Sequence, residues 1–115
     1  MTRFSRLAFG VALCAAPLIT QSHAEPSVHR IVIAKMAFGA SPENLRMGDV
    51  VEWANEDIFV HSATAADGSF DVDVQPKGVA RVVIRTAGVI RYRCKYHPGM
   101  QGTLTVGSPP VSGSR

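Results

Sequence analysis

Three side chains that bind soft metal ions follow one another at equal spacing near the C-terminal end of the sequence. Cys94, His97 and Met100 lie three residues apart. Thiolate, imidazole and thioether groups suit copper in both of its common oxidation states. Pro98 and Gly99 lie between the last two of these residues and favour a tight bend. The spacing therefore predicts a loop whose three side chains converge on one metal ion.

A blue-copper site needs a second imidazole. The sequence holds four histidines. His23 lies in the N-terminal segment that we expect to be removed, and His29 lies close behind it, whereas His61 directly follows the apolar, strand-like stretch 58–60. Two imidazoles and one thiolate with a weak axial thioether form the blue-copper arrangement. The expected copper ligands are His61, Cys94, His97 and Met100.

Each of these residues, taken alone, also has an ordinary explanation. A single cysteine in a strand usually packs as a small hydrophobic side chain. His97 alone would be a surface loop residue, Met100 alone would be core, and His61 alone would be a half-exposed or hydrogen-bonded histidine. The joint spacing and the strand-loop-strand setting favour the metal site over these separate explanations. Met36, Met47 and His29 are expected to be packing or surface residues and not a second copper site.

Residues 1–24 have the pattern of a secretory signal peptide. Arg3 and Arg6 supply the positive start, the run 7–19 is mostly apolar, and residues 22–24 offer small side chains around a cleavage site after Ala24. The apolar run is shorter than the roughly 20 residues that a membrane span needs, which argues against the alternative of a retained anchor. We expect export to the periplasm with no stable membrane insertion.

Cleavage after Ala24 changes what the composition implies. Cys14 and two arginines leave with the signal, so Cys94 becomes the only cysteine and the formal charge falls from +3 to +1. A lone thiol in an oxidising compartment needs burial or a metal to protect it. A nearly neutral domain also gives no support for nucleic-acid binding.

The exported region alternates strand patterns with turn residues and has no sustained helical period. These features predict an all-β fold, an antiparallel sandwich of about seven or eight strands, forming one domain over residues 25–107. A polar tail follows at 108–115 and is expected to be disordered. Leu45 is expected in a short extended piece between two turns. The expected strands cover residues 28–35, 50–54, 60–65, 70–74, 80–86, 89–94 and 103–106.

Three segments resemble the cupredoxins. Residues 87–94 resemble the Gly-x-x-x-Tyr-x-Cys strand of that family, and 47–55 followed by His61 resemble the segment that supplies its first imidazole. Residues 97–102 are similar to the short ligand loop of the amicyanin type, which is tighter than the plastocyanin loop. The resemblance covers nearly all of 28–106. It implies a Greek-key sandwich, type 1 copper and electron transfer in the periplasm.

The sequence departs from the family pattern beside the first histidine. Val60 and Ser62 stand where the family often has proline and asparagine. The asparagine usually ties the first ligand strand to the cysteine loop, and a serine side chain is shorter. The family pattern therefore does not fix the rigidity or the reduction potential of this site. Lys95 and Tyr96 also place larger side chains just before His97.

Strand parity indicates a docking surface. If Cys94 points inward, Arg91 and Arg93 point to solvent, and Lys95 adds a third positive charge beside the ligand loop. These charges would steer an acidic redox partner; the plainer alternative is an ordinary solvated face.

The expected function is that of a monomeric electron carrier, not an enzyme, shuttling single electrons between a redox donor and an acceptor. The alternative is a periplasmic copper storage or delivery protein, which would favour exposed methionine and histidine clusters. A structural sandwich with a stray cysteine is a third possibility. The sequence shows no second metal site that would serve a copper enzyme.

Overall fold

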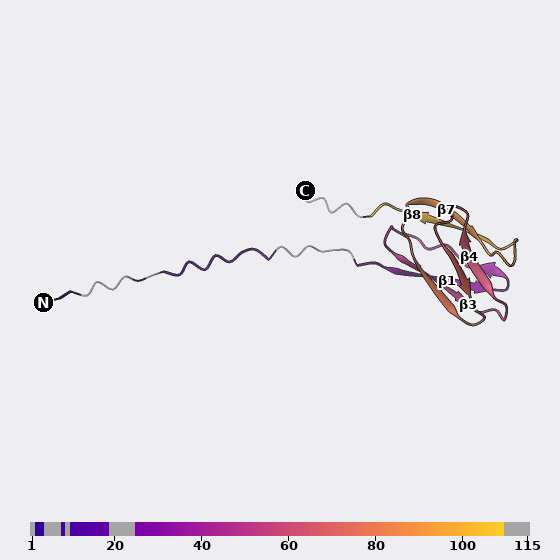
Figure 1. Cartoon of the computed structure of the whole chain (residues 1–115), viewed down its shortest axis with the longest axis horizontal. Helices are drawn as coiled ribbons and strands as arrows, with labels where there is room; N and C mark the ends of the chain where they lie inside the picture. The colour runs from indigo at the N-terminus through magenta and orange to yellow at the C-terminus, as the bar shows by residue number, and fades with distance from the viewer. Residues whose placement is uncertain (1, 4–7, 9, 19–24, 110–115) are drawn as a thin grey trace.

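Two four-stranded β-sheets pack face to face in this chain (Figure 1). The computed structural model describes residues 2–3, 8, 10–18 and 25–109, and these contain eight strands and no helix. The first sheet has the order β2-β1-β3-β6 and the second β5-β4-β7-β8. The strands are β1 (Val28–Ala34), β2 (Ala37–Phe38), β3 (Val50–Asn55), β4 (His61–Ala65), β5 (Asp71–Val74), β6 (Val79–Val83), β7 (Gly88–Arg93) and β8 (Gln101–Val106).

The all-β sandwich expected from the sequence is confirmed, with three local differences. β6 ends at Val83, three residues before the predicted end. The two-residue strand β2 was missed, because so short a segment carries no alternation to detect. Leu45 is buried but lies in no strand; its neighbour Arg46 forms an isolated bridge with Gly107.

One pair of strands departs from the expected antiparallel arrangement. β1 and β3 run parallel, with Val28 opposite Val50 and Ile33 opposite Asn55, while the other named pairs are antiparallel. Alternation of apolar and polar residues reports which face of a strand is buried, and it carries no information on strand direction. The connection through β2 and residues 39–49 returns the chain to the start of β3.

An aromatic cluster fills the space between the two sheets. Trp53 of β3 is fully buried and its ring centroid lies 5.6 Å from that of Tyr92 on β7. The rings of Phe38 and Phe70 lie 4.7 Å and 6.1 Å from the Tyr92 ring. Burial raises the pKa of the Tyr92 phenol. Gly102 of β8 lies opposite Tyr92 in the sheet register, and the missing side chain leaves room for that ring.

The beginning of β1 and the end of β8 lie at the same end of the sandwich. Asp49, just before β3, accepts a hydrogen bond from the Ser27 amide at 3.0 Å and contacts His29 Nε2 at 2.9 Å. Burial opposes ionisation of Asp49, but hydrogen bonds from His29 and from backbone amides outweigh it, so its pKa is lowered. The amide of Met47, in the same turn, donates to the Gly107 carbonyl. Both ends of the folded domain are therefore attached to one turn.

The N-terminal residues that the structure describes lie outside the sandwich. Residues 10–18 form neither strand nor helix, and among all described residues no helix is long and apolar enough to cross a membrane. The expected cleavage site and most of the expected tail fall at 19–24 and 110–115, outside the described residues. The signal peptide and the disordered tail remain predictions.

Candidate metal centre

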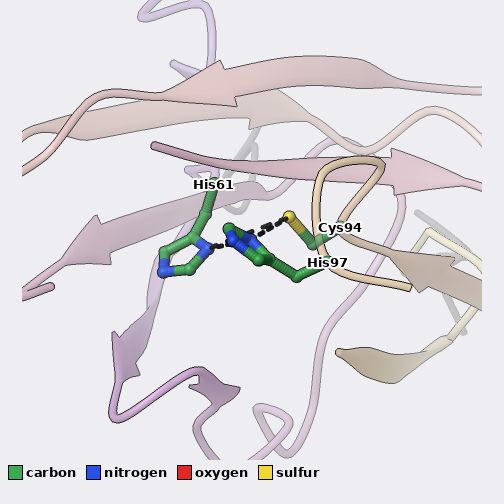
Figure 2. A group of neighbouring side chains, drawn as sticks. All are labelled: His61, Cys94 and His97. Atoms are coloured by element: carbon green, nitrogen blue, oxygen red, sulfur yellow. Dashed lines mark hydrogen bonds between the residues drawn. The ribbon is translucent and has the colours of Figure 1, made fainter. Parts of the chain in front are cut away.

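Three of the four predicted ligands come together at the end of the sandwich opposite the two chain ends. His61 is the first residue of β4, and Cys94 directly follows β7. β4 and β7 are neighbours, with Thr64 opposite Arg93, so the sheet brings their ends side by side. His97 lies on the loop that connects β7 to β8. Figure 2 shows the two imidazoles and the thiol facing one another.

The donor atoms are spaced as a metal site requires. His61 Nδ1 lies 3.2 Å from His97 Nδ1, and Cys94 Sγ lies 3.8 Å and 3.6 Å from these two nitrogens. Three atoms at these separations leave a point roughly 2 Å from each, which is close to the length of metal–imidazole and metal–thiolate bonds. The donor set therefore fits a single small ion. Among the described residues this is the one such group of histidine, cysteine or carboxylate side chains.

Backbone hydrogen bonds close the ligand loop. The Met100 amide donates to the His97 carbonyl at 2.9 Å, and the Cys94 amide donates to the Met100 carbonyl at 3.1 Å. Met100 is buried and packs in the same cluster as Cys94. The loop thus begins and ends beside the site. The structure places Met100 next to the other ligands in the fold, and its role as the axial donor remains a prediction.

Ser62 takes over the tie between the first ligand strand and the cysteine loop. Its amide donates to Cys94 Sγ at 3.3 Å, and its hydroxyl accepts a hydrogen bond from the Lys95 amide at 2.8 Å. Ser62 is fully buried. The shorter side chain therefore still links β4 to the ligand loop, and the Ser62 amide is a donor aimed at the thiol sulfur.

Lys95, expected to add a third positive charge beside the ligand loop, is paired with carboxylates. Its ammonium lies 3.2 Å from Asp71 and 3.1 Å from Asp73, two carboxylates on the neighbouring edge strand β5. Tyr96 donates a hydrogen bond to Asp73 at 2.8 Å. The hydrogen bonds from Tyr96 and Lys95 hold the pKa of Asp73 below its ordinary value. These side chains tie the loop to β5.

Strand parity correctly predicted the two faces of β7. Ile90, Tyr92 and Cys94 are buried, while Arg91 and Arg93 are exposed. Neither arginine forms an ion pair with a carboxylate in the described part of the chain. A shallow pocket on the outer surface of β7 and β8 lies between them and is lined by Gln101 and Thr103 among others. The exposed positive charge beside the site is therefore that of two arginines.

Met36, Met47 and His29 lie in three different surroundings. His29 is hydrogen-bonded to Asp49. Met47 packs against the core, and Met36 is exposed. The three residues thus have the packing and surface roles expected from the sequence.

Sequence reasoning missed Asp57. Its carboxylate Oδ2 lies 2.8 Å from Nε2 of His61, the ring nitrogen that faces away from Cys94 and His97. Residues 55–57 look like an ordinary turn in the sequence, and a carboxylate four positions before a ligand histidine is a weak signal. Hydrogen bonds from the Met36 amide and from His61 lower the pKa of Asp57.

Among the three clustered side chains, His97 lies nearest to solvent. It is partly exposed, whereas His61 and Cys94 are fully buried. The exposed ring of Phe59 meets the His97 ring edge-on, with centroids 6.3 Å apart. Ile58, which precedes Phe59 in the chain, is also exposed. Exposed apolar side chains of the loop before β4 therefore include one that contacts His97.

No protein-family model matches the sequence, and no curated protein matches it. Solved structures do. A proline-to-glycine variant of amicyanin in its reduced Cu(I) form superposes with a TM-score of 0.61 at 23% identity, covering 75% of this chain and 87% of that one. A reduced proline-to-phenylalanine variant gives 0.60 at 23% identity with the same coverage. An oxidised methionine-to-leucine variant gives 0.59 at 23% identity, covering 68% and 80%.

The fold is that of a cupredoxin. This confirms the fold that the resemblance to the cupredoxins implied. In this cupredoxin fold the two segments that carry candidate ligands, the start of β4 and the β7–β8 connection, are neighbours in one sheet. The chemistry of the site rests on the side chains present there.

Proposed function

We propose that the chain is a periplasmic electron carrier that holds one copper ion through His61, Cys94, His97 and Met100. The observation that carries this proposal is the convergence of two imidazoles and one thiol on a point roughly 2 Å from each. A bound copper ion would supply a one-electron change between Cu(I) and Cu(II). The solved amicyanin structures with this fold include reduced Cu(I) forms.

The surroundings of the donors favour electron transfer over copper delivery. His61 and Cys94 are fully buried, and hydrogen bonds fix the loop that carries the other two ligands. A rigid, buried site imposes one coordination on both oxidation states and slows metal release. A delivery protein would gain from exposed, mobile ligands. We infer that electrons leave through the exposed edge of His97, within the apolar surface formed by Ile58 and Phe59.

The test is a visible absorption spectrum of the protein titrated with Cu(II) and then treated with ascorbate. We expect an intense thiolate-to-copper band that saturates at one copper per chain and bleaches on reduction. A folded protein that gives no such band contradicts the assignment. Reversible transfer of copper, and not of electrons, to a second protein would instead support delivery.

Met100 is expected to tune the reduction potential as a weak axial ligand. Met100→Leu removes a thioether donor that stabilises Cu(II), so the blue band should remain and the potential should rise. A rise on the order of 60 mV corresponds to a tenfold relative stabilisation of the reduced form. Voltammetry of both proteins measures it. A lower potential in the variant would exclude Met100 as the axial ligand.

We infer that the exported form begins at Glu25 and folds as one domain over residues 25–107. The positive start and the apolar run of residues 1–24 support this inference. The mass of the protein recovered from the periplasm is the measurement. A mass that retains residues 1–24 would contradict cleavage.

We propose that a redox partner with an acidic surface docks beside the ligand loop, guided by Arg91 and Arg93. Both are exposed and unpaired within the described residues, and β7 places them on one face. Arg91→Glu with Arg93→Glu should slow association with such a partner at low salt, with a smaller effect at high salt. Stopped-flow reduction rates at several ionic strengths test this. Unchanged rates at low salt would exclude the arginines as a docking surface.

A further inference from the structure

The turn between β1 and β2 has a backbone geometry that its side chains do not favour. Lys35 and Met36 lie between the paired residues Ala34 and Ala37, and their φ angles are 51° and 61°. Two left-handed central residues make a type I′ hairpin turn, where asparagine and glycine are preferred. Lysine and methionine rarely adopt this conformation. Contacts from outside the hairpin must therefore stabilise the turn.

The carboxylate of Asp57 provides these contacts. The Lys35 amide donates to Oδ1 at 2.8 Å, and the Met36 amide donates to Oδ2 at 3.0 Å. These are the two central N–H groups of the turn, and both bind one carboxylate. The turn thereby fixes the position and orientation of the Asp57 side chain.

Asn55 holds the same residue from the other side. The Asp57 amide donates to Asn55 Oδ1 at 2.9 Å. The Asn55 amide group donates in turn to the carbonyls of Phe59 at 2.7 Å and Val74 at 3.1 Å, and Asn55 is buried. The loop between β3 and β4 is thus attached to β5. Asn55 thus holds the backbone of Asp57, while the β1–β2 turn holds its side chain.

The fixed carboxylate meets His61 on the side opposite the metal centre. Oδ2 of Asp57 lies 2.8 Å from His61 Nε2, while His61 Nδ1 lies 3.8 Å from Cys94 Sγ. A carboxylate accepts the proton of Nε2, which leaves a lone pair on Nδ1. Such partners fix the tautomer and ring orientation of metal-binding histidines. The arrangement prepares Nδ1 as a donor aimed at the site.

We propose that Asp57 is the positioning residue of the metal centre, and that the β1–β2 turn and Asn55 hold it so that His61 is an Nδ1 donor before any metal binds. The identity of the metal rests on the proposed function, whereas the tautomer of His61 does not. The strained turn holds the Asp57 carboxylate and through it the His61 ring. Its two amides and the imidazole share one carboxylate.

The experiment begins with the metal-free protein. Nitrogen-15 NMR at a pH where imidazole is neutral should show His61 protonated at Nε2. Asp57→Ala should lose this preference, because it removes the oxygen that accepts the Nε2 proton. Cu(I) affinity, measured by competition with a chelator, should then fall about 10- to 100-fold. Asp67→Ala is the matched control: it removes one exposed carboxylate from a turn in which Asp67 accepts a hydrogen bond from the Ser69 amide, and should change neither quantity.

A double substitution in the β1–β2 turn separates the positioning of His61 from a general effect on the stability of the fold. Lys35→Asn with Met36→Gly, combined with Asp57→Ala, supplies residues that suit the turn, so it should restore the melting temperature that Asp57→Ala loses. It should not restore the His61 tautomer or the Cu(I) affinity. The proposal is overturned if wild-type His61 carries its proton on Nδ1, or if Asp57→Ala keeps the preference for the Nε2–H form. If no blue band forms, the tautomer result still decides the role of Asp57.

Discussion

Cys94→Ser is expected to abolish the intense visible band of the copper-loaded protein completely. The band arises from charge transfer between a thiolate and Cu(II), and Cys94 Sγ lies 3.8 Å from His61 Nδ1 and 3.6 Å from His97 Nδ1. A hydroxyl is a harder ligand and a poor donor to Cu(I). The variant should therefore lose the colour and bind copper much more weakly. Absorption spectra and copper stoichiometry measure both effects.

Two further variants exclude unfolding as the cause. Cys94 is fully buried, so a serine there costs about 1–3 kcal/mol if its hydroxyl finds no partner. Cys94→Ala avoids a buried hydroxyl and should also be colourless while keeping its circular dichroism spectrum. Lys95→Gln changes the neighbouring residue, whose ammonium faces Asp71 and Asp73, and should stay blue. An intense band in folded Cys94→Ser would refute the thiolate assignment.

Gly102→Ala is expected to give the largest loss of stability among small substitutions in the fold. A Cβ at this position would lie 2.3 Å from the Tyr92 ring. That ring cannot move aside, because Phe38, Trp53 and Phe70 surround it. Overpacking of this kind costs about 1–3 kcal/mol, occasionally more. Each kcal/mol lowers the melting temperature of a domain this size by about 4–8 °C.

Gly99→Ala is the matched control for this prediction. A Cβ atom added at Gly99 would have no neighbour within 4 Å, and the residue has no left-handed φ, so alanine should fit there with little change in melting temperature. Thermal unfolding of the metal-free proteins is the measurement, which keeps metal binding out of the comparison. Equal melting temperatures for the two variants would show that Tyr92 can relax.

The parts of the site that the sequence predicted are those encoded locally. Cys94, His97 and Met100 fall on one short loop, so their spacing alone indicates that they bind one metal ion together. His61 follows from the choice among four histidines, and the alternation along β7 predicts that Arg91 and Arg93 face solvent. These inferences needed only neighbouring residues and the period of a strand.

The parts that escaped prediction depend on contacts between distant segments. Asp57 is held in place because the β1–β2 turn lies against the loop before β4. The residue types at 55–57 do not indicate that contact. In the sequence Lys95 has no carboxylate nearby, whereas in the fold β5 places Asp71 and Asp73 beside its ammonium. The parallel pairing of β1 with β3 was hidden for the same reason, since a burial pattern is identical in either strand direction.

The attachment of both ends of the domain to the turn around Asp49 affects how the protein can be tethered. β1 begins and β8 ends at that end of the sandwich. The opposite end holds the start of β4, where His61 lies, and the end of β7, which Cys94 follows, because the antiparallel register places Arg93 opposite Gln101 and Gly88 opposite Val106. A fusion partner, a surface linker or a membrane anchor joined at either terminus would therefore hold the domain by its far end. The apolar surface around His97 would face outward, free to meet a second protein or an electrode.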